Sequence, residues 1–172
     1  MSIHLYDSTV ATFLQTLGAL EGVLARGADH CREQGIELQD ITAARIYPDM
    51  LPFSYQVTAT IGHSVGALEA VRSGTFNPPK HVDLDYAGLQ RAVVEARETL
   101  TQVSVDEVNA SLGRDVKFQL GDRAIPFTAE GFLLSFSVPN FFFHSSMAYA
   151  ILRGKGVPLS KRDFMGRLRI KR

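Results

Sequence analysis

The stretch GFLLSFSVPNFFFHSSMAYAIL, residues 131–152, decides how the whole chain is interpreted, because it contains no charged residue. A helix of this length could cross a bilayer. However, the stretch includes Pro139, Asn140, His144 and four serines, which are costly in hydrocarbon, and no basic flank precedes it. A helix that is apolar all round is also typical of the middle of a bundle. We therefore predict a buried bundle helix and no membrane span.

Three segments that precede this stretch show the periodicity of amphipathic helices, with apolar residues in steps of three and four. Gly35 marks the end of the first segment, Pro52 suits the first turn of the second, and the second runs to about Ser73. The predicted buried stripes are Tyr6, Val10, Phe13, Leu17, Leu20, Leu24 and Cys31, then Phe53, Val57, Ile61, Leu68 and Val71, then Tyr86, Leu89, Val93, Ala96, Leu100 and Val103.

A short region between the third helix and the last one has a different pattern. Residues 104–107 form the capping box of a short helix. The runs DVKFQL and RAIPFT flank a Gly-Asp pair and predict a two-stranded hairpin, in which Pro126 confines its strand to an edge. Thr128 is the expected N-cap of the last helix. The predicted fold class is mainly α, a four-helix bundle with a short β-hairpin before the last long helix.

Length and composition indicate one domain, residues 1–172, with a sizeable core. Hydrophobic residues make up 45% and charged residues 21% of the chain, which is ordinary globular composition. The single cysteine, Cys31, excludes an internal disulfide and fits a reducing compartment. The N-terminal sequence lacks the basic and apolar regions of a secretory signal, so we expect a cytoplasmic protein.

The C-terminal tail, about residues 160–172, is basic although the formal net charge of the chain is zero. It holds six basic residues and one acidic residue, so the rest carries 12 of the 18 basic and 17 of the 18 acidic residues. Such a tail can bind nucleic acid or acidic lipid, lie against its own acidic body, or stay solvated. Four apolar residues in the tail favour docking onto the body: Phe164, Met165, Leu168 and Ile170.

The candidate site begins with Asn140 and His144, which are four residues apart and share one helical face. They can hydrogen-bond each other or a common partner. An unsatisfied polar group in so apolar a stretch would cost about 1–3 kcal/mol, so another group must meet them. By pattern this group is His63, the one functional side chain on a flank of small residues in the second helix. That flank comprises Ala59, Gly62, Gly66, Ala67 and Ala70.

Two histidines from facing helices can begin a metal site, because neutral imidazole suits zinc, nickel, copper and iron. A catalytic zinc takes three protein ligands, and only His63 and His144 can be named here. Ala148 stands one turn after His144, and Tyr149 lies on a different face. Spacing selects none of the possible third ligands, Asp49, Asp85, His4, His30 and His81. Alternatively, His144 and Asn140 form a satisfied polar pair in the core, with His63 nearby.

The run PNFFFHSSMAYAILRGKGVPLSKRDFMG, residues 139–166, resembles the closing signature of an uncharacterised bacterial and fungal family, a domain of unknown function. The run RIYPDMLPFSYQV, residues 45–57, and the region 60–63 also resemble it. The family is placed with the DinB/YfiT-like four-helix bundles. The resemblance covers most of the chain and implies that fold.

The resemblance also implies a ligand set. Metal-binding members of the superfamily hold a divalent metal with one histidine on the second helix and a His-x-x-x-His pair on the last. His63 matches the first histidine and His144 the second, but Ala148 stands where the third belongs. Relatives with complete sites include metal-dependent thiol transferases and hydrolases, and the fold alone does not carry these activities to this chain.

Three functional hypotheses follow. The first is a DinB-like bundle with a degenerate metal site, acting as a small-molecule-binding or interaction protein and forming a homodimer, with Asn140, Ala148 and Tyr149 in its pocket. The second is a divalent-metal enzyme, of transferase or hydrolase type, that uses zinc or nickel held by His63, His144 and a third ligand from a loop. The third and least favoured is nucleic-acid binding through the tail. The sequence indicates no substrate.

Overall fold

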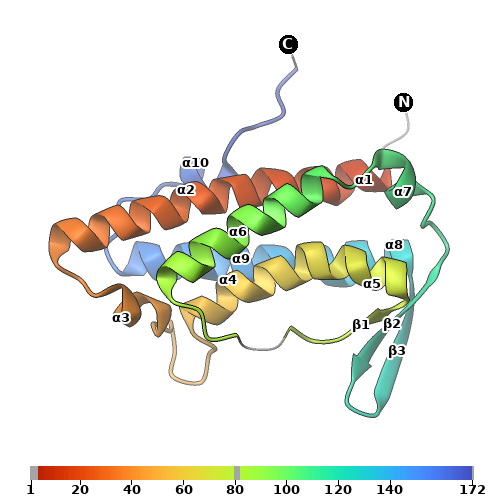
Figure 1. The fold of residues 1–172 in the computed structure, drawn as a ribbon, viewed down its shortest axis with the longest axis horizontal. Coiled ribbons are helices and arrows are strands. Elements are labelled where there is room, and N and C mark those ends of the chain that lie inside the picture. The colour runs from red at the N-terminus through yellow and green to blue at the C-terminus, as the bar shows by residue number, and fades with distance from the viewer. Residues whose placement is uncertain (1–3, 80–81, 172) are drawn as a thin grey trace.

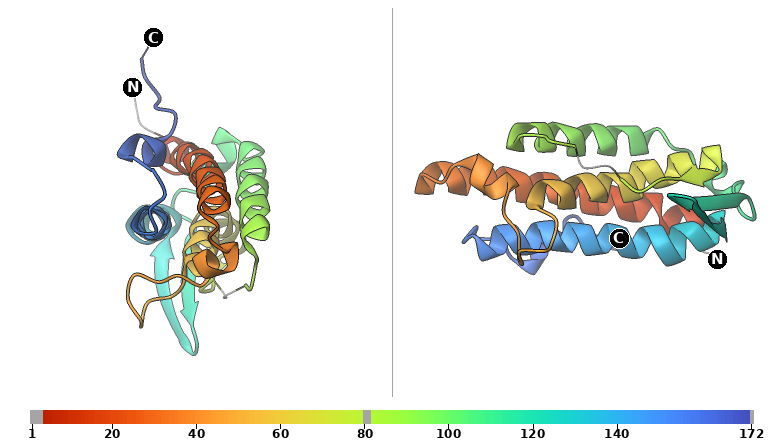
Figure 2. Two further views of the ribbon diagram at one scale, coloured as in Figure 1. Left: turned by 90° about the vertical axis from the view of Figure 1, so that its left-hand side faces the viewer. Right: turned by 90° about the horizontal axis from the view of Figure 1, so that it is seen from below.

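The computed structural model describes residues 4–79 and 82–171, and four long helical arms dominate it (Figure 1). The arms are α2 (Val10–Gln34); α4 (Phe53–Ile61) continued by the π-helical segment η1 (Gly62–Gly66) and α5 (Ala67–Ser73); α6 (Tyr86–Thr101); and α8 (Ala129–Gly131) continued by the π-helical segment η2 (Phe132–Ser137) and α9 (Val138–Gly154). Both α2 and α4 pack against α6 and α9. The end-on view shows the arms grouped around one core (Figure 2). The predicted four-helix bundle is confirmed.

Short helices complete the helical part: α1 (Leu5–Ser8), α3 (Leu38–Thr42), α7 (Val105–Asn109) and α10 (Lys161–Met165). Gly35 ends α2 with φ of 65°, as predicted. Ser104 Oγ accepts a hydrogen bond from the Glu107 N–H, which is half of the predicted capping box. The Glu107 carboxylate also binds Arg72, at 2.6 Å.

The sheet has three strands where the sequence predicted two. β2 (Asp115–Leu120) and β3 (Arg123–Thr128) form the predicted antiparallel hairpin, and β1 (Thr75–Phe76) adds to β2 in parallel. A two-residue strand is too short to show any alternation, so the sequence did not reveal it. Pro126 lies on the edge strand β3, as expected. The hairpin projects from the end of the bundle where α5 and α8 lie (Figure 1).

The core follows the predicted stripes. All of the stripe residues are buried except Tyr6 and Ile61, which are half-buried. The largest fully buried side chains include Tyr86, whose hydroxyl donates a hydrogen bond of 2.8 Å to the Leu24 carbonyl. Gly27 leaves room for this hydroxyl, because a Cβ there would fall within contact distance of it.

The last arm is buried on one face only, which corrects the prediction of a helix buried all round. Phe132 and Phe141 are fully buried, whereas Leu134, Phe142 and Phe143 are 45%, 37% and 52% exposed. Each arm of a four-helix bundle keeps an outward face, and here that face is apolar. Within residues 4–79 and 82–171, no helix has the combination of length and apolarity needed to cross a membrane.

The first part of the tail docks on the body. α10 packs against α2, Arg26 contacts Asp163 at 3.2 Å, and Gln15 donates a hydrogen bond of 2.9 Å to the Met165 carbonyl. The Phe164 ring contacts that of Tyr149, with centroids 5.7 Å apart. The predicted docking role is therefore confirmed for this part of the tail.

The last part of the tail begins with a turn at Gly166. This residue has φ of 60°, and a Cβ there would lie 2.9 Å from the Ala19 Cβ. Beyond the turn, Arg169 donates hydrogen bonds to the Asp7 carbonyl at 3.3 Å and to the Thr12 hydroxyl at 3.4 Å, but Leu168 and Ile170 are 52% and 74% exposed. The predicted docking role of these two residues is wrong.

Candidate functional site: a buried histidine pair

The imidazole rings of His63 and His144 lie next to each other inside the bundle. Their centroids are 5.6 Å apart and their planes differ by 13°. His63 comes from η1 and is 4% exposed, whereas His144 comes from α9 and is half-buried. The structure therefore brings together the two histidines that the sequence singled out from facing helices.

Both π-helical segments adjoin this pair. Gly62 opens η1, and a Cβ there would lie 2.6 Å from the Pro79 Cγ, so only glycine allows this close approach. The segment η2 precedes Pro139, which has no N–H and whose ring crowds the carbonyl one turn earlier. Short π-helical turns inside α-helices are frequent at functional sites. Here η1 supplies His63 and η2 supplies Ser137.

The tautomer of His144 is set by Gln56 on the facing helix. The Gln56 side-chain N–H donates a hydrogen bond of 2.9 Å to the Leu51 carbonyl, so Oε1 is the atom that faces His144. This oxygen can only accept, and it lies 2.9 Å from His144 Nδ1. His144 Nδ1 therefore carries the proton, and Nε2 of the neutral ring has a lone pair.

His63 has a more apolar environment. Its Nδ1 lies 3.4 Å from Ser137 Oγ, a hydroxyl that can donate or accept, so either tautomer is compatible with this bond. The rings of Phe76 and Phe136 lie 5.3 and 5.6 Å away. Burial, and to a smaller extent the neighbouring His144, lowers the pKa of His63 to about 4. Burial also lowers the pKa of His144. Both rings are therefore uncharged at neutral pH.

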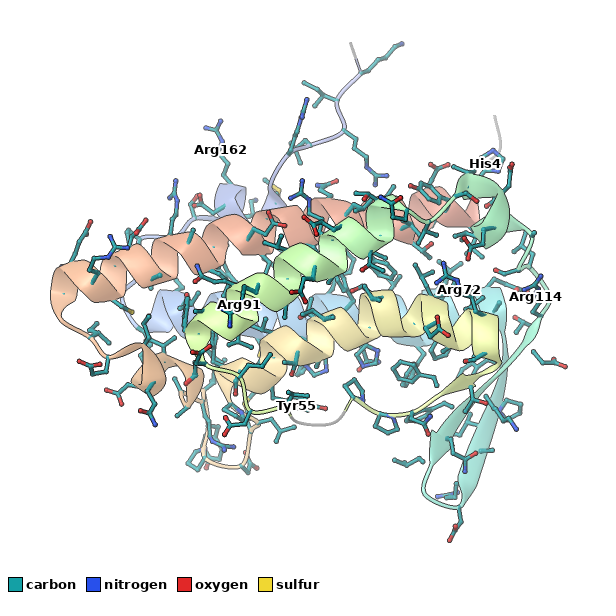
Figure 3. All side chains as sticks on the ribbon, in the orientation of Figure 1. His4, Tyr55, Arg72, Arg91, Arg114 and Arg162 are labelled. Carbon is teal, nitrogen blue, oxygen red and sulfur yellow. The ribbon has the colours of Figure 1, made fainter. Side chains whose placement is uncertain are left out.

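Gln56 and Tyr55 are functional neighbours that the sequence analysis missed. Gln56 precedes His63 by seven positions, so it lies on the same face two turns earlier, and this spacing could have revealed it. The Tyr55 ring contacts the edge of His144 at 5.8 Å, and Tyr55 lies on the side of α4 away from α6 (Figure 3). Phe143 makes a similar edge contact with His144 at 5.2 Å.

The predicted partnership of Asn140 and His144 is wrong. Asn140 donates its side-chain hydrogen bond to the Phe136 carbonyl at 2.8 Å, because this carbonyl lies one turn earlier on its own helix. Ala148 is fully buried, and Tyr149 contacts Phe164 of the docked tail. Of the three predicted pocket residues, none has a hydrogen bond or ring contact with either histidine in the part of the chain that the structure describes.

The ring separation alone fits a shared metal ion. Two metal–nitrogen bonds of about 2.0–2.1 Å would hold a pair of imidazole rings with centroids roughly 5–6 Å apart. Both rings are neutral, as metal ligands must be, and His144 Nε2 has its lone pair available. The pair therefore provides two neutral imidazoles at a separation that suits one ion.

The third ligand is what the site lacks. No group of three His, Cys, Asp or Glu side chains that could hold a metal occurs among the described residues. Asp85 caps α6 by accepting from the Gly88 N–H at 2.6 Å, and His4 and Asp49 are exposed. His30 lies beside Gly156, and His81 lies outside the described residues. The side chains present do not fit a catalytic centre with three protein ligands.

A family model described as "Domain of unknown function (DUF1993)" matches residues 5–165 of the chain. The chain belongs to this family. No protein with a curated description matches this DUF1993 chain. Its structure is similar to the crystal structure of a DinB family member from Shewanella denitrificans, with a TM-score of 0.80 and 22% sequence identity. The similarity covers 98% of this chain and 95% of that one. At this identity it shows a shared DinB-like fold, which confirms the predicted resemblance.

Proposed function

We propose that the histidine pair is a small-molecule-binding site without a resident metal, in which His144 Nε2 accepts a hydrogen bond from the ligand. The observation that carries this proposal is the chain of bonds from the Leu51 carbonyl through Gln56 to His144. It holds one ring nitrogen as a bare acceptor and fixes the orientation of the ring. Fixed acceptors of this kind give a binding site its specificity.

The surroundings of the pair favour a flat, uncharged ligand. Aromatic rings of Tyr55, Phe136 and Phe143 lie against one or the other histidine. The low pKa values leave no positive charge on the pair at neutral pH. Aromatic walls bind planar apolar molecules through offset-stacked and edge contacts. We therefore expect a small molecule with an aromatic body and one O–H or N–H donor.

A divalent-metal enzyme of transferase or hydrolase type is the second candidate. The 5.6 Å separation of the two rings supports it, because this separation suits a shared ion. Against it stands the buried methyl group of Ala148 at the position where a third histidine would complete the ligand set. Metal analysis separates the two candidates. Stoichiometric zinc or nickel in protein purified without an affinity tag, lost on His63→Ala, would support the enzyme and overturn the first proposal.

Phenol and anisole provide the direct test of ligand binding. The two molecules share the aromatic ring, but only phenol has an O–H donor. Titration followed by NMR should show that phenol shifts the His144 ring signals at lower concentration than anisole does. In the variant His144→Phe, followed through the neighbouring His63 ring signals, the difference between the two probes should disappear, since phenylalanine keeps a ring and removes the acceptor. Equal responses to phenol and anisole in the unaltered chain would contradict the proposal.

A further inference from the structure

A hollow of about 580 Å³ lies apart from the histidine pair, where three segments meet. These segments are α3 with the residues that follow it, the start of α4, and the residues that lead into α6. Figure 1 shows them at the end of the bundle opposite the sheet. The volume is typical of small-molecule sites, which span roughly 300–1,000 Å³. Leu38, Ala43 and Leu84 give it an apolar wall, and Arg45, Ser54 and Asp83 give it polar groups.

The N-terminus of α4 opens into this hollow without a side-chain cap. Its N-cap residue is Pro52, which has no side-chain acceptor. The Phe53 N–H donates to the Ala44 carbonyl at 2.8 Å, but the Ser54 N–H has no acceptor among the described residues. The helix continues through η1 and α5, so the aligned peptide dipoles of a long arm end here. Free N–H groups at such an end attract an anion.

The Ser54 hydroxyl points to a ligand independently of the helix end. Ser54 is 5% exposed and lines the hollow, and its hydroxyl has no hydrogen-bond partner among residues 4–79 and 82–171. Within these residues, every side-chain oxygen or nitrogen that is fully buried has a hydrogen-bond partner. Because the Ser54 hydroxyl has no partner, it is not fully buried, and it is open to the hollow that Ser54 lines. Thr60 and Ser64 on the same arm instead bond back to carbonyls of their own helix, at 2.8 and 3.0 Å.

The charged groups of the hollow have both signs. Arg45 donates one N–H to the Met50 carbonyl and keeps further donors for another partner. Neither Arg45 nor Asp83 belongs to any ion pair of the described residues. Arg45 follows α3 and Asp83 precedes α6, so the two charges come from different walls. Together with the α4 N-terminus, these groups suit a ligand that has an anionic and a cationic end.

We propose that this hollow binds a free α-amino acid with an apolar side chain. The ligand carboxylate would bind to the Ser54 N–H, the Ser54 hydroxyl and Arg45. The ligand ammonium group would bind to Asp83. The apolar side chain would lie against Leu38 and Leu84. This site is separate from the histidine pair and does not depend on the function proposed there.

Titrations of the full chain with leucine, phenylalanine and methionine, followed by NMR, test this proposal. Two analogues of leucine serve as matched probes: 4-methylpentanoate lacks the amine, and 3-methylbutylamine lacks the carboxylate. At least one amino acid should bind at millimolar concentration, and each leucine analogue should bind about tenfold more weakly than leucine, which corresponds to one lost charged contact. Failure of all three amino acids to bind would overturn the proposal.

Two variants assign the binding to the hollow. Ser54→Ala and Asp83→Asn should each weaken amino-acid binding about tenfold, and their amide spectra report whether the fold is retained. Asp83→Asn should leave the response of the His144 ring signals to phenol unchanged. A failure of the amino-acid site can therefore be distinguished from a failure of the ligand site proposed at the histidine pair. Unchanged amino-acid binding in both variants would show that the ligand occupies another place, and would overturn the assignment.

Discussion

Gln56 and His144 are joined by a hydrogen bond of 2.9 Å between Oε1 and Nδ1, and this bond decides the chemistry of the histidine pair. Gln56 is 3% exposed, and its amide is oriented by the Leu51 carbonyl at its other end. A histidine held in this way has a known tautomer, because only Nδ1–H satisfies the glutamine oxygen. Everything expected of His144 as an acceptor depends on Gln56.

Replacing Gln56 with glutamate should raise the pKa of His144. A carboxylate at the same distance favours the charged imidazolium, whereas the wild-type pKa lies below the ordinary value because of burial. Replacement with leucine removes the bond without adding a charge and should leave the pKa low. NMR titration of the His144 ring proton measures both variants. An identical pKa in the glutamate variant and the wild type would show that the two side chains do not interact.

The stability of the fold should depend on His63 below neutral pH. The unfolded chain binds a proton at His63 near pH 6.5, but the folded chain keeps the ring neutral down to about pH 4. Between these values the unfolded state binds more protons, so the free energy of unfolding falls as the pH falls. The contribution is fully present above pH 6.5, and its loss by pH 4 is on the order of 3 kcal/mol.

Urea unfolding between pH 5 and 7 measures this effect with little interference from carboxylates. The variant His63→Asn is the control, because its amide can take the place of Nδ1 beside Ser137 and does not titrate. Its free energy of unfolding should change less with pH in this range than that of the wild type. Equal pH dependence in both proteins would contradict the buried, neutral His63.

Adding the missing ligand should create a metal site. The variant Ala148→His places a histidine one turn after His144, on the same face. We expect zinc affinity to rise about a hundredfold over the wild type, since a third nitrogen completes the usual ligand set. Calorimetric zinc titration measures the gain, and Ala148→Leu controls for the added volume at this buried position. A wild type that already binds zinc as tightly as the histidine variant would contradict the two-ligand account.

The sequence predicted the helical arms well, because stripes such as Leu89, Val93 and Leu100 report burial through their spacing. It predicted that His63 and His144 face each other because His63 stood out among small residues on its arm, and because His144 stood out with Asn140 in an apolar stretch. It did not predict the exposed face of α9, because an uncharged run carries no signal of which side meets solvent. Gln56 was missed because a glutamine looks like an ordinary surface residue until a buried partner is known.

The exposed apolar face of α9 is a surface through which the predicted homodimer could form. Phe142 and Phe143 are 37% and 52% exposed, and they lie within the uncharged stretch of residues 131–152. If two copies of the chain pack together through this face, Phe143→Asp should convert the dimer into a monomer, because it would bury an unpaired charge in the interface. Light scattering after size exclusion gives the mass, and Leu112→Asp, at another exposed apolar position, should leave it unchanged. A wild type that is monomeric at high concentration would refute the homodimer.

The protonation of the His144 ring nitrogens at neutral pH tests the central claim most directly. Long-range proton–nitrogen correlation spectra distinguish a protonated nitrogen, a bare nitrogen and a metal-bound nitrogen by their chemical shifts. For protein purified without an affinity tag, we predict a protonated Nδ1 and a bare Nε2, unchanged by removal of metal with a chelator. A proton on Nε2, or a metal-bound shift at Nε2 that the chelator abolishes, would contradict the two-histidine binding site described above.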